Sequence, residues 1–251
     1  MSEETSAKRI NKYISETGYC SRREADRLVE AGKVTVNGVI ASLGTKVATG
    51  DEVRVNNQLV SIQKEPLYIA FHKPIGITCT TLRTVPDNIV EYINHPERIF
   101  PVGRLDKPSE GLIFLTTDGD IVNKILRAGN QHEKEYVVTV DRPITDDFIQ
   151  RMSNGVAIMD TVTRKCKVTR ESNYRFRIIL TQGLNRQIRR MCKTLGYQVT
   201  KLVRVRIMNI HLDGLQEGQW RYFTKEELLT IHELVANSVM TAEASVIDDE
   251  E

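Results

Sequence analysis

The chain has 251 residues, of which 40% are hydrophobic and 27% are charged, a composition typical of a globular protein that can bury a core. No apolar run approaches the roughly 20 residues needed to cross a bilayer. The first six residues are polar and acidic, unlike the basic and then apolar plan of a secretory signal. These features argue against a membrane-spanning or secreted protein and predict a cytoplasmic one.

The four cysteines and five histidines are scattered along the chain, so we expect reduced structural thiols and no metal site. The net charge of +2 conceals an asymmetry. Residues 238–251 hold five acids and no base, which leaves 35 basic and 28 acidic residues in the remainder. Residues 182–212 hold seven basic residues and no acid, which indicates a polyanionic partner. We expect the acidic segment 237–251 to be a disordered tail.

In chain order, the first predicted unit spans residues 7–63. Apolar residues at helical spacing begin at Ile10 and the pattern ends at Gly18. Residues 21–24 have the Ser-x-x-Glu order of a capping box and begin a second helix that ends at Gly32. Asn37 and Gly38 lie between two short apolar runs and predict the type I′ turn of a β-hairpin.

A polar stretch ending in proline predicts a linker over residues 64–67, and a second domain follows over residues 68–236. We predict strands over residues 67–71, 111–116, 135–140 and 174–180, and helices over residues 120–126, 146–152, 186–195 and 226–235. A capping box at residues 224–227 begins the last helix. This irregular alternation is typical of an α+β fold and not of repeated βαβ units.

The segment from Gly103 to Asp106 lies between two apolar runs, which places a carboxylate at a junction between strand and loop. Taken alone, Asp106 is better explained as a turn residue or as an ion-pair partner of Arg104.

Its context changes that interpretation. Residues 103–106, then Lys134-Glu135-Tyr136, then residues 183–191 resemble, in order and spacing, the catalytic motifs of RNA pseudouridine synthases. Residues 9–14, 20–26 and 32–38 resemble the S4 RNA-binding domain. The combination is similar to the branch of the family that includes RsuA, RluB, RluE and RluF, over about residues 8–235.

This resemblance implies a small S4 domain followed by a mixed α+β catalytic domain with a largely antiparallel sheet. It implies Asp106 as the nucleophile, Arg189 as the cation that keeps it ionised, and Tyr136 as the aromatic residue that receives the target base. Arg104 resembles the arginine that takes the place of the displaced base. The isomerisation gains and loses no group, so neither cofactor nor metal is expected.

The partner implied is structured RNA, with a uridine of 23S ribosomal RNA as the substrate and the tyrosine tRNA anticodon as a second candidate. We expect a monomer. Besides Arg104, the predicted RNA contacts come from the basic residues of the S4-like unit and of the basic stretch: Lys8, Arg9, Lys12, Arg22, Arg23, Arg186, Arg190, Lys193, Arg204 and Arg206.

Two alternatives stay open at this point. A non-catalytic S4-type RNA-binding or ribosome-associated protein would also account for the basic residues. A hydrolase using Asp106 and Glu110 as a carboxylate pair is the second, although Glu110 has no independent support.

Overall fold

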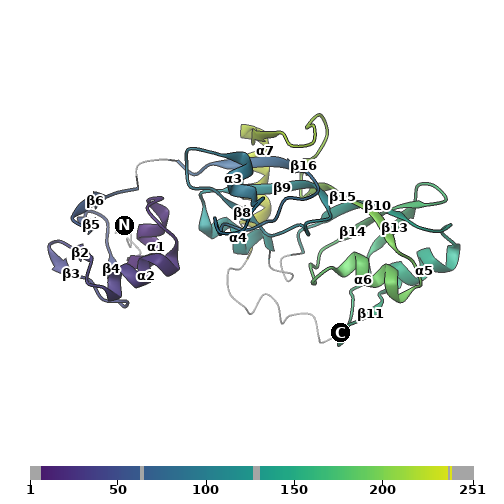
Figure 1. Ribbon diagram of the computed structural model, residues 1–251, viewed down its shortest axis with the longest axis horizontal. Coiled ribbons are helices and arrows are strands. Elements are labelled where there is room, and N and C mark those ends of the chain that lie inside the picture. Colours follow the sequence, from purple (N-terminus) through teal and green to yellow (C-terminus); the bar gives the residue numbers. More distant parts are fainter. Residues whose placement is uncertain (1–6, 63–64, 127–130, 237, 239–251) are drawn as a thin grey trace. The chain divides into compact units, whose positions relative to one another are not determined.

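The computed structural model describes residues 7–62, 65–126, 131–236 and 238 (Figure 1). The chain divides into two compact units. One consists of the segment up to Pro66 with Pro96–Arg98, and the other of Leu67–His95 with the residues from Ile99 onward. The predicted tail over residues 237–251 lies outside the described residues, apart from Ser238. In the described part of the chain, no helix is both long enough and apolar enough to span a bilayer.

The first unit packs two helices against small antiparallel sheets. Its elements are β1 (Lys8–Arg9), α1 (Ile10–Glu16), α2 (Arg22–Glu30), β2 (Val34–Val36), β3 (Val39–Ile40), β4 (Lys46–Val47), β5 (Val53–Val55) and β6 (Gln58–Val60). Four of the strands form one sheet in the order β3-β2-β5-β6, and β1 pairs with β4. Apolar residues of both helices and of the sheet close a core of their own around Ile10, Ile14 and Val53.

Local signals in this unit are largely confirmed. Asn37 and Gly38 have φ values of 51° and 80°, as the two central residues of a type I′ turn require. The Ser21 side chain caps α2 by accepting a hydrogen bond from the Glu24 backbone N–H at 3.2 Å. The predicted capping box is not complete: the cap described for α2 is the Ser21 side chain alone, and the Glu24 carboxylate accepts a hydrogen bond from Arg27 at 3.1 Å.

The second unit is built around a nine-stranded sheet. Its strands are β7 (Tyr68–Lys73), β8 (Phe100–Val102), β9 (Glu110–Thr116), β10 (Lys134–Val140), β13 (Lys167–Arg170), β14 (Arg175–Leu180), β15 (Val199–Ile207), β16 (Ile210–His211) and β17 (Trp220–Tyr222). The helices are α3 (Ile89–Ile93), α4 (Gly119–Leu126), α5 (Asp146–Asn154), α6 (Gln187–Thr194) and α7 (Lys225–Val235), and a separate hairpin joins β11 (Ala157–Ile158) to β12 (Thr161–Val162).

The main sheet has the strand order β13-β14-β10-β15-β9-β7-β17. Every pairing in it is antiparallel except that of β15 with β9, which is parallel and joins the two halves of the sheet. At this joint Gly111 faces Arg204, and a Cβ atom on Gly111 would lie 2.3 Å from the Arg204 carbonyl oxygen. Only glycine therefore allows the two halves to approach this closely.

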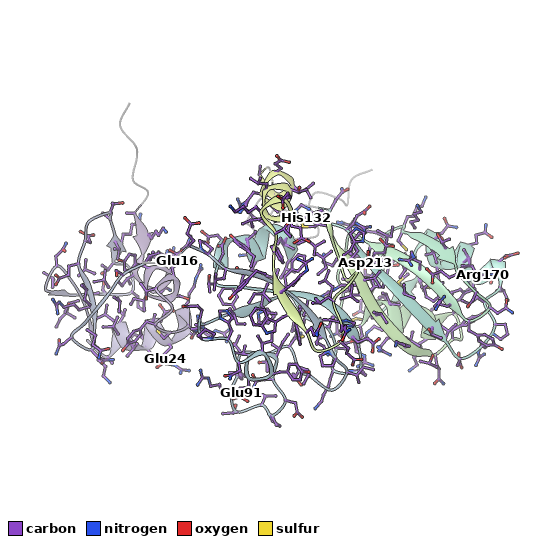
Figure 2. All side chains as sticks on the ribbon, turned by 90° about the horizontal axis from the view of Figure 1, so that it is seen from above. Glu16, Glu24, Glu91, His132, Arg170 and Asp213 are labelled. Carbon is purple, nitrogen blue, oxygen red and sulfur yellow. The ribbon has the colours of Figure 1, made fainter. Side chains whose placement is uncertain are left out.

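Helices cover the two halves of the sheet differently. One face of β10 and β14 packs against α5 and α6 through Val138, Phe176 and Met191. Strands β7 and β9 are buried on both faces, because Ala70 and Phe114 belong to a core with α4 and α7 while Phe71 and Ile113 belong to a core with α3. Figure 2 labels Arg170 of β13, the strand at the outer edge of the main sheet. Arg170 pairs with Asp146 of α5 at 2.8 Å.

The predicted α+β class is confirmed, and each of the four strands and four helices predicted in this domain is present. The Thr224 capping box is complete, with both of its reciprocal hydrogen bonds formed. The longest strand, β15, is absent from the predicted elements, as are β13 and α3. The alternation of apolar and polar residues that would predict β15 is obscured by Lys201, Arg204 and Arg206. Their partners, Glu110, the Leu112 carbonyl and Glu135, lie in distant segments of the chain.

Candidate active site

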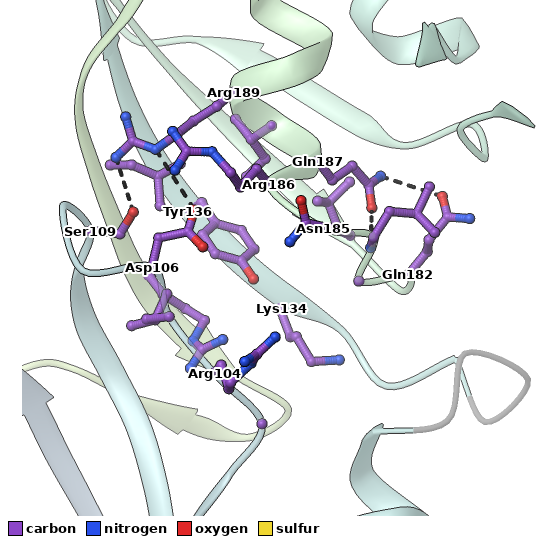
Figure 3. Close-up of a pocket in the computed structure, with 18 of the residues that line it drawn as sticks. Arg104, Asp106, Ser109, Lys134, Tyr136, Gln182, Asn185, Arg186, Gln187 and Arg189 are labelled. Atoms are coloured by element: carbon purple, nitrogen blue, oxygen red, sulfur yellow. Dashed lines mark hydrogen bonds and ion pairs between the residues drawn. The ribbon is translucent and has the colours of Figure 1, made fainter. Parts of the chain in front are cut away.

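A pocket of about 460 Å³ opens where the two halves of the main sheet meet (Figure 3). Its lining includes the loop between β8 and β9 and the turn that leads into α6. Lys134 and Tyr136 of β10 and Leu202 and Arg204 of β15 line it as well. The three residues predicted to be catalytic, Asp106, Tyr136 and Arg189, all line it, together with Arg104 and Arg186. The fold therefore gathers the three motifs into one cavity.

Asp106 lies in the loop that follows β8, and its side chain is 34% exposed. The loop is fixed on both sides of the carboxylate. Leu105 is buried and its backbone N–H donates to Cys79 Sγ at 3.4 Å, while the backbone carbonyl of Asp106 accepts from the N–H of Ser109 at 2.9 Å. The carboxylate is thus held by its backbone while it remains open to the pocket.

The ion pair at Asp106 is with Arg189 of α6, whose Nε lies 4.0 Å from Asp106 Oδ2. Arg104, the alternative partner considered from the sequence, is exposed and lines the pocket. Burial lowers the pKa of the Arg189 guanidinium, and the nearby Asp106 charge raises it. A guanidinium stays protonated well above neutral pH, so Arg189 offers Asp106 a permanent positive charge.

Tyr136 is in β10, directly opposite Arg204 of β15. Its ring packs against two of the hydrophobic cores, one under α5 and α6 and one under α3. In Figure 3 the ring lies beside the Asp106 carboxylate, with the hydroxyl directed into the pocket. An aromatic face held in this way can stack on a base that has left a helical stack.

The turn before α6 is held by a buried amide. Gln187 is 4% exposed, and its Oε1 accepts from the Leu184 N–H at 3.0 Å while its Nε2 donates to Gln182 Oε1 at 3.3 Å. Arg186, just before the helix, has a left-handed backbone with a φ value of 51°. This conformation is costly for a residue other than glycine, and the buried Gln187 holds the turn that contains it.

The pocket also contains a buried cation that the sequence analysis did not single out. Lys134 is 8% exposed, and its Nζ donates to the His132 carbonyl at 3.3 Å. Burial and the neighbouring Arg204 charge lower the pKa of Lys134 to about 8. A sequence signal existed, because residues 134 and 136 of one strand point to the same face.

The predicted RNA-binding residues fall into distinct environments. In the first unit, Arg9, Arg22 and Arg23 are exposed, and Lys8 and Lys12 pair with Glu16 at 2.8 and 3.6 Å. In the second unit, Arg186 and Lys193 are exposed, and Arg190 donates to Asn185.

The stretch 182–212 does not form one basic face. Arg204 is 4% exposed and donates to the Leu112 carbonyl at 2.6 Å. Arg206 pairs with Glu133 at 2.8 Å and with Glu135 at 2.6 Å. Neither guanidinium is free at the surface, so the geometry gives no support to a phosphate contact by either residue.

The carboxylate-pair alternative is wrong for this pocket. Glu110 is 7% exposed, is held by Lys201 at 2.8 Å, and is not among the lining residues. A second carboxylate facing Asp106 across a bound sugar is therefore missing from the described lining. Among the described residues, no three His, Cys, Asp or Glu side chains gather as a metal site.

Comparison with protein families gives two matches. Residues 67–194 match the model of the RNA pseudouridylate synthases, and residues 8–53 match that of the S4 domain.

Comparison with individual proteins agrees. The chain is 58% identical to the dual-specificity RNA pseudouridine synthase RluF of Salmonella typhi over 232 residues, covering 92% of this chain and 80% of the relative. It is 32% identical to the ribosomal large subunit pseudouridine synthase B of Bacillus subtilis, covering 90% and 96% of the two chains. A crystal structure of a pseudouridylate synthase superposes with a TM-score of 0.66 at 27% identity and covers 89% of this chain and 99% of that one.

Proposed function

The chain belongs to the RNA pseudouridylate synthase family and has an N-terminal S4 domain, and from this premise we propose how and on which RNA it acts. The reaction class is that of an isomerase that converts uridine to pseudouridine in RNA, which excludes the binding-only alternative. We propose that Asp106 is the nucleophile of this reaction. The observation that carries the proposal is the pocket in which Asp106, Tyr136 and Arg189 meet.

In this reaction the N1–C1′ glycosidic bond breaks, the uracil turns, and a C5–C1′ bond forms. The proton leaves C5, and N1 gains one, so atoms and electrons balance without a redox partner. A carboxylate that attacks covalently divides this exchange into two easier steps. Asp106 lines the pocket, and Arg189 Nε lies 4.0 Å from its carboxylate oxygen Oδ2, an arrangement that suits that role.

Tyr136 would receive the uracil face, and Arg104 would fill the space that the base leaves in the RNA. Extruding a base from the helical stack costs a few kcal/mol. Stacking of that base on an aromatic ring contributes about 1–3 kcal/mol and partly offsets this cost. The residues proposed to contact phosphates are the exposed Arg186 and Lys193 and the half-buried Arg190 of the α6 region, with Lys8, Arg9, Lys12, Arg22 and Arg23 of the S4 domain. Arg204 and Arg206 are left out of this set.

The substrate we propose is a uridine of 23S ribosomal RNA, with tyrosine tRNA as a second substrate. The support is the likeness to dual-specificity relatives named RluF, from Salmonella typhi and from Escherichia coli strain K12. We further propose that the enzyme is cytoplasmic and acts as a monomer.

The test uses unmodified 23S ribosomal RNA and tyrosine tRNA with the wild-type protein and with Asp106→Asn. Carbodiimide treatment followed by primer extension maps each pseudouridine. We expect product with the wild type and none with Asp106→Asn, which is nearly isosteric and keeps RNA binding. Product formed by Asp106→Asn would remove Asp106 as the nucleophile, and a wild type inactive on both RNAs would remove the proposed substrates.

A further inference from the structure

Ser109 is a buried hydroxyl residue three positions after Asp106, immediately before β9. Its side chain is 2% exposed, and its backbone N–H donates to the Asp106 carbonyl at 2.9 Å. Its hydroxyl Oγ accepts a hydrogen bond from Nη2 of Arg189 at 3.0 Å (Figure 3). One residue is therefore tied both to the backbone of the proposed nucleophile and to the side chain of its cation.

The other hydrogen bonds of Arg189 leave one nitrogen directed at Asp106. Nη2 also donates to the Pro108 carbonyl at 3.0 Å, and Nη1 donates to the Val199 carbonyl at 3.4 Å. Nε is buried without a hydrogen-bond partner and lies 4.0 Å from Asp106 Oδ2. Because a guanidinium is planar, fixing its two terminal nitrogens also fixes the direction of Nε.

The contact with Asp106 cannot itself orient Arg189. A charge-assisted N–H···O hydrogen bond has a length of about 2.7–2.9 Å, and the 4.0 Å separation is well beyond this. The short contacts that hold the guanidinium in the described structure are those to Pro108 and Ser109. Of these two, Ser109 is the one that a side-chain substitution can remove.

We propose that Ser109 is a positioning residue that orients the Arg189 guanidinium so that its Nε faces Asp106. The inference rests on the proposed function of Asp106 and extends it. Ser109 lines the pocket and acts through Arg189, whose Nη2 donates to its hydroxyl. Removing the Ser109 hydroxyl leaves the charge of Arg189 in the pocket but no longer fixes the direction of its Nε. We therefore expect turnover to fall while RNA binding is kept.

The first experiment compares Ser109→Ala with the wild type under single-turnover conditions at saturating RNA. A hydrogen bond to a charged group contributes enough that we expect the rate to fall roughly 10- to 100-fold, with RNA affinity within about twofold of wild type. Ser109→Thr keeps the hydroxyl and should restore most of the rate. Ser153→Ala, which removes a hydroxyl that donates to Ile149 in α5, is the matched control and should keep the full rate.

A second measurement separates positioning from a merely structural role. Arg189→Lys keeps a positive charge but cannot span Pro108 and Ser109 with a planar fork. If Ser109 acts through Arg189, adding Ser109→Ala to Arg189→Lys lowers the rate less than about twofold further, because coupled residues are not additive. A full additional 10-fold loss in the double variant would overturn the inference, and this result does not depend on Ser109→Thr folding well.

The outcomes also distinguish this inference from the proposed function. If the wild type forms pseudouridine, Asp106→Asn does not, and Ser109→Ala keeps the wild-type rate, the positioning role is overturned while the nucleophile stands. If Asp106→Asn remains active, the proposed function itself fails, whatever Ser109→Ala does.

Discussion

At the scale of single residues, Lys134 is a pocket residue whose environment differs strongly from water. It is 8% exposed, and burial together with the charge of Arg204 lowers its pKa from 10.5 to about 8. The folded protein therefore disfavours the charged form of Lys134. Below pH 8, Lys134 is protonated in both the folded and the unfolded protein, and its burial costs the full free energy. Above pH 10.5 it is neutral in both, and the cost disappears.

We predict that Lys134→Met makes this cost visible. Relative to the variant, the wild type should gain about 3 kcal/mol of unfolding free energy between pH 7 and pH 10.5. The measurement is urea unfolding followed by the fluorescence of Trp220, the single tryptophan, which lies in the same unit as Lys134. Lys193→Met, at an exposed position of α6, controls for the loss of a surface charge. A stability difference that stays constant with pH would contradict the prediction.

At the scale of elements, the parallel pairing of β9 with β15 decides where the pocket forms. It joins two antiparallel halves and brings the loop after β8 next to β10 and the start of α6. The pairing depends on Gly111, which has a φ value of 114° and leaves no room for a Cβ atom beside Arg204. The capping box at Thr224 is a second element feature with an energetic role, because it begins α7 against the core under β7 and β9.

For Gly111→Ala we expect a loss of at least about 3 kcal/mol of unfolding free energy, or no folded protein, because the new Cβ meets backbone and the backbone conformation is strained. Urea unfolding of the purified protein, or its soluble yield, is the measurement. Gly183→Ala is the control, since nothing lies within 4 Å of its Cβ position. Equal stability of the two variants would show that the β9–β15 joint can spread at little cost.

For Thr224→Ala we expect a loss of about 1 kcal/mol, because the N–H of Glu227 loses its acceptor at the beginning of the helix. Thr230→Ala, in the middle of the same helix, removes a hydroxyl that donates only to the preceding turn. It should be neutral or slightly stabilising, because alanine has the higher helix propensity. Thermal unfolding of both variants tests the prediction, which fails if the two lose the same stability.

At the scale of the whole molecule, the chain is two units with separate cores, and the described pocket belongs entirely to the second. The predicted phosphate contacts of the S4 domain lie on the first unit, where Arg9, Arg22 and Arg23 are exposed. In the proposed assignment the first unit contributes phosphate contacts alone, whereas the second unit contributes the pocket and the contacts of the α6 region. Removing the first unit should therefore affect mainly RNA affinity.

A chain that begins at Leu67 should therefore keep its single-turnover rate at saturating RNA within about threefold but bind RNA more weakly. Each lost phosphate contact lowers the slope of log affinity against log salt by about 0.7–0.9, so the salt dependence should become shallower as well. Filter binding at several salt concentrations measures both quantities. A collapse of the saturated rate would show that the first unit contributes to the chemistry.

Residue patterns within short segments were enough to predict many turns, helix caps and helices of this protein. The I′ turn at Asn37, the Ser21 and Thr224 caps and the main helices depend on residues near each other in the chain, so short segments are enough to predict them. The family resemblance likewise identified Asp106, Tyr136 and Arg189 from the order of three motifs, and the fold brings them into one pocket.

The sequence by itself determined the local elements, the S4 and synthase motifs and the candidate residues. Only the tertiary structure decided which basic side chains are left available to contact RNA. Arg204, Arg206 and Lys201 resemble a basic surface in sequence, but Leu112, Glu135 and Glu110 satisfy them from distant segments, which is also why β15 is absent from the predicted strands. The structure likewise decided what holds Arg189, because Ser109 lies 80 residues away and only the joint between β9 and β15 brings the two together. Contacts of this kind depend on how strands pair across the sheet, and no local pattern of residues encodes that pairing.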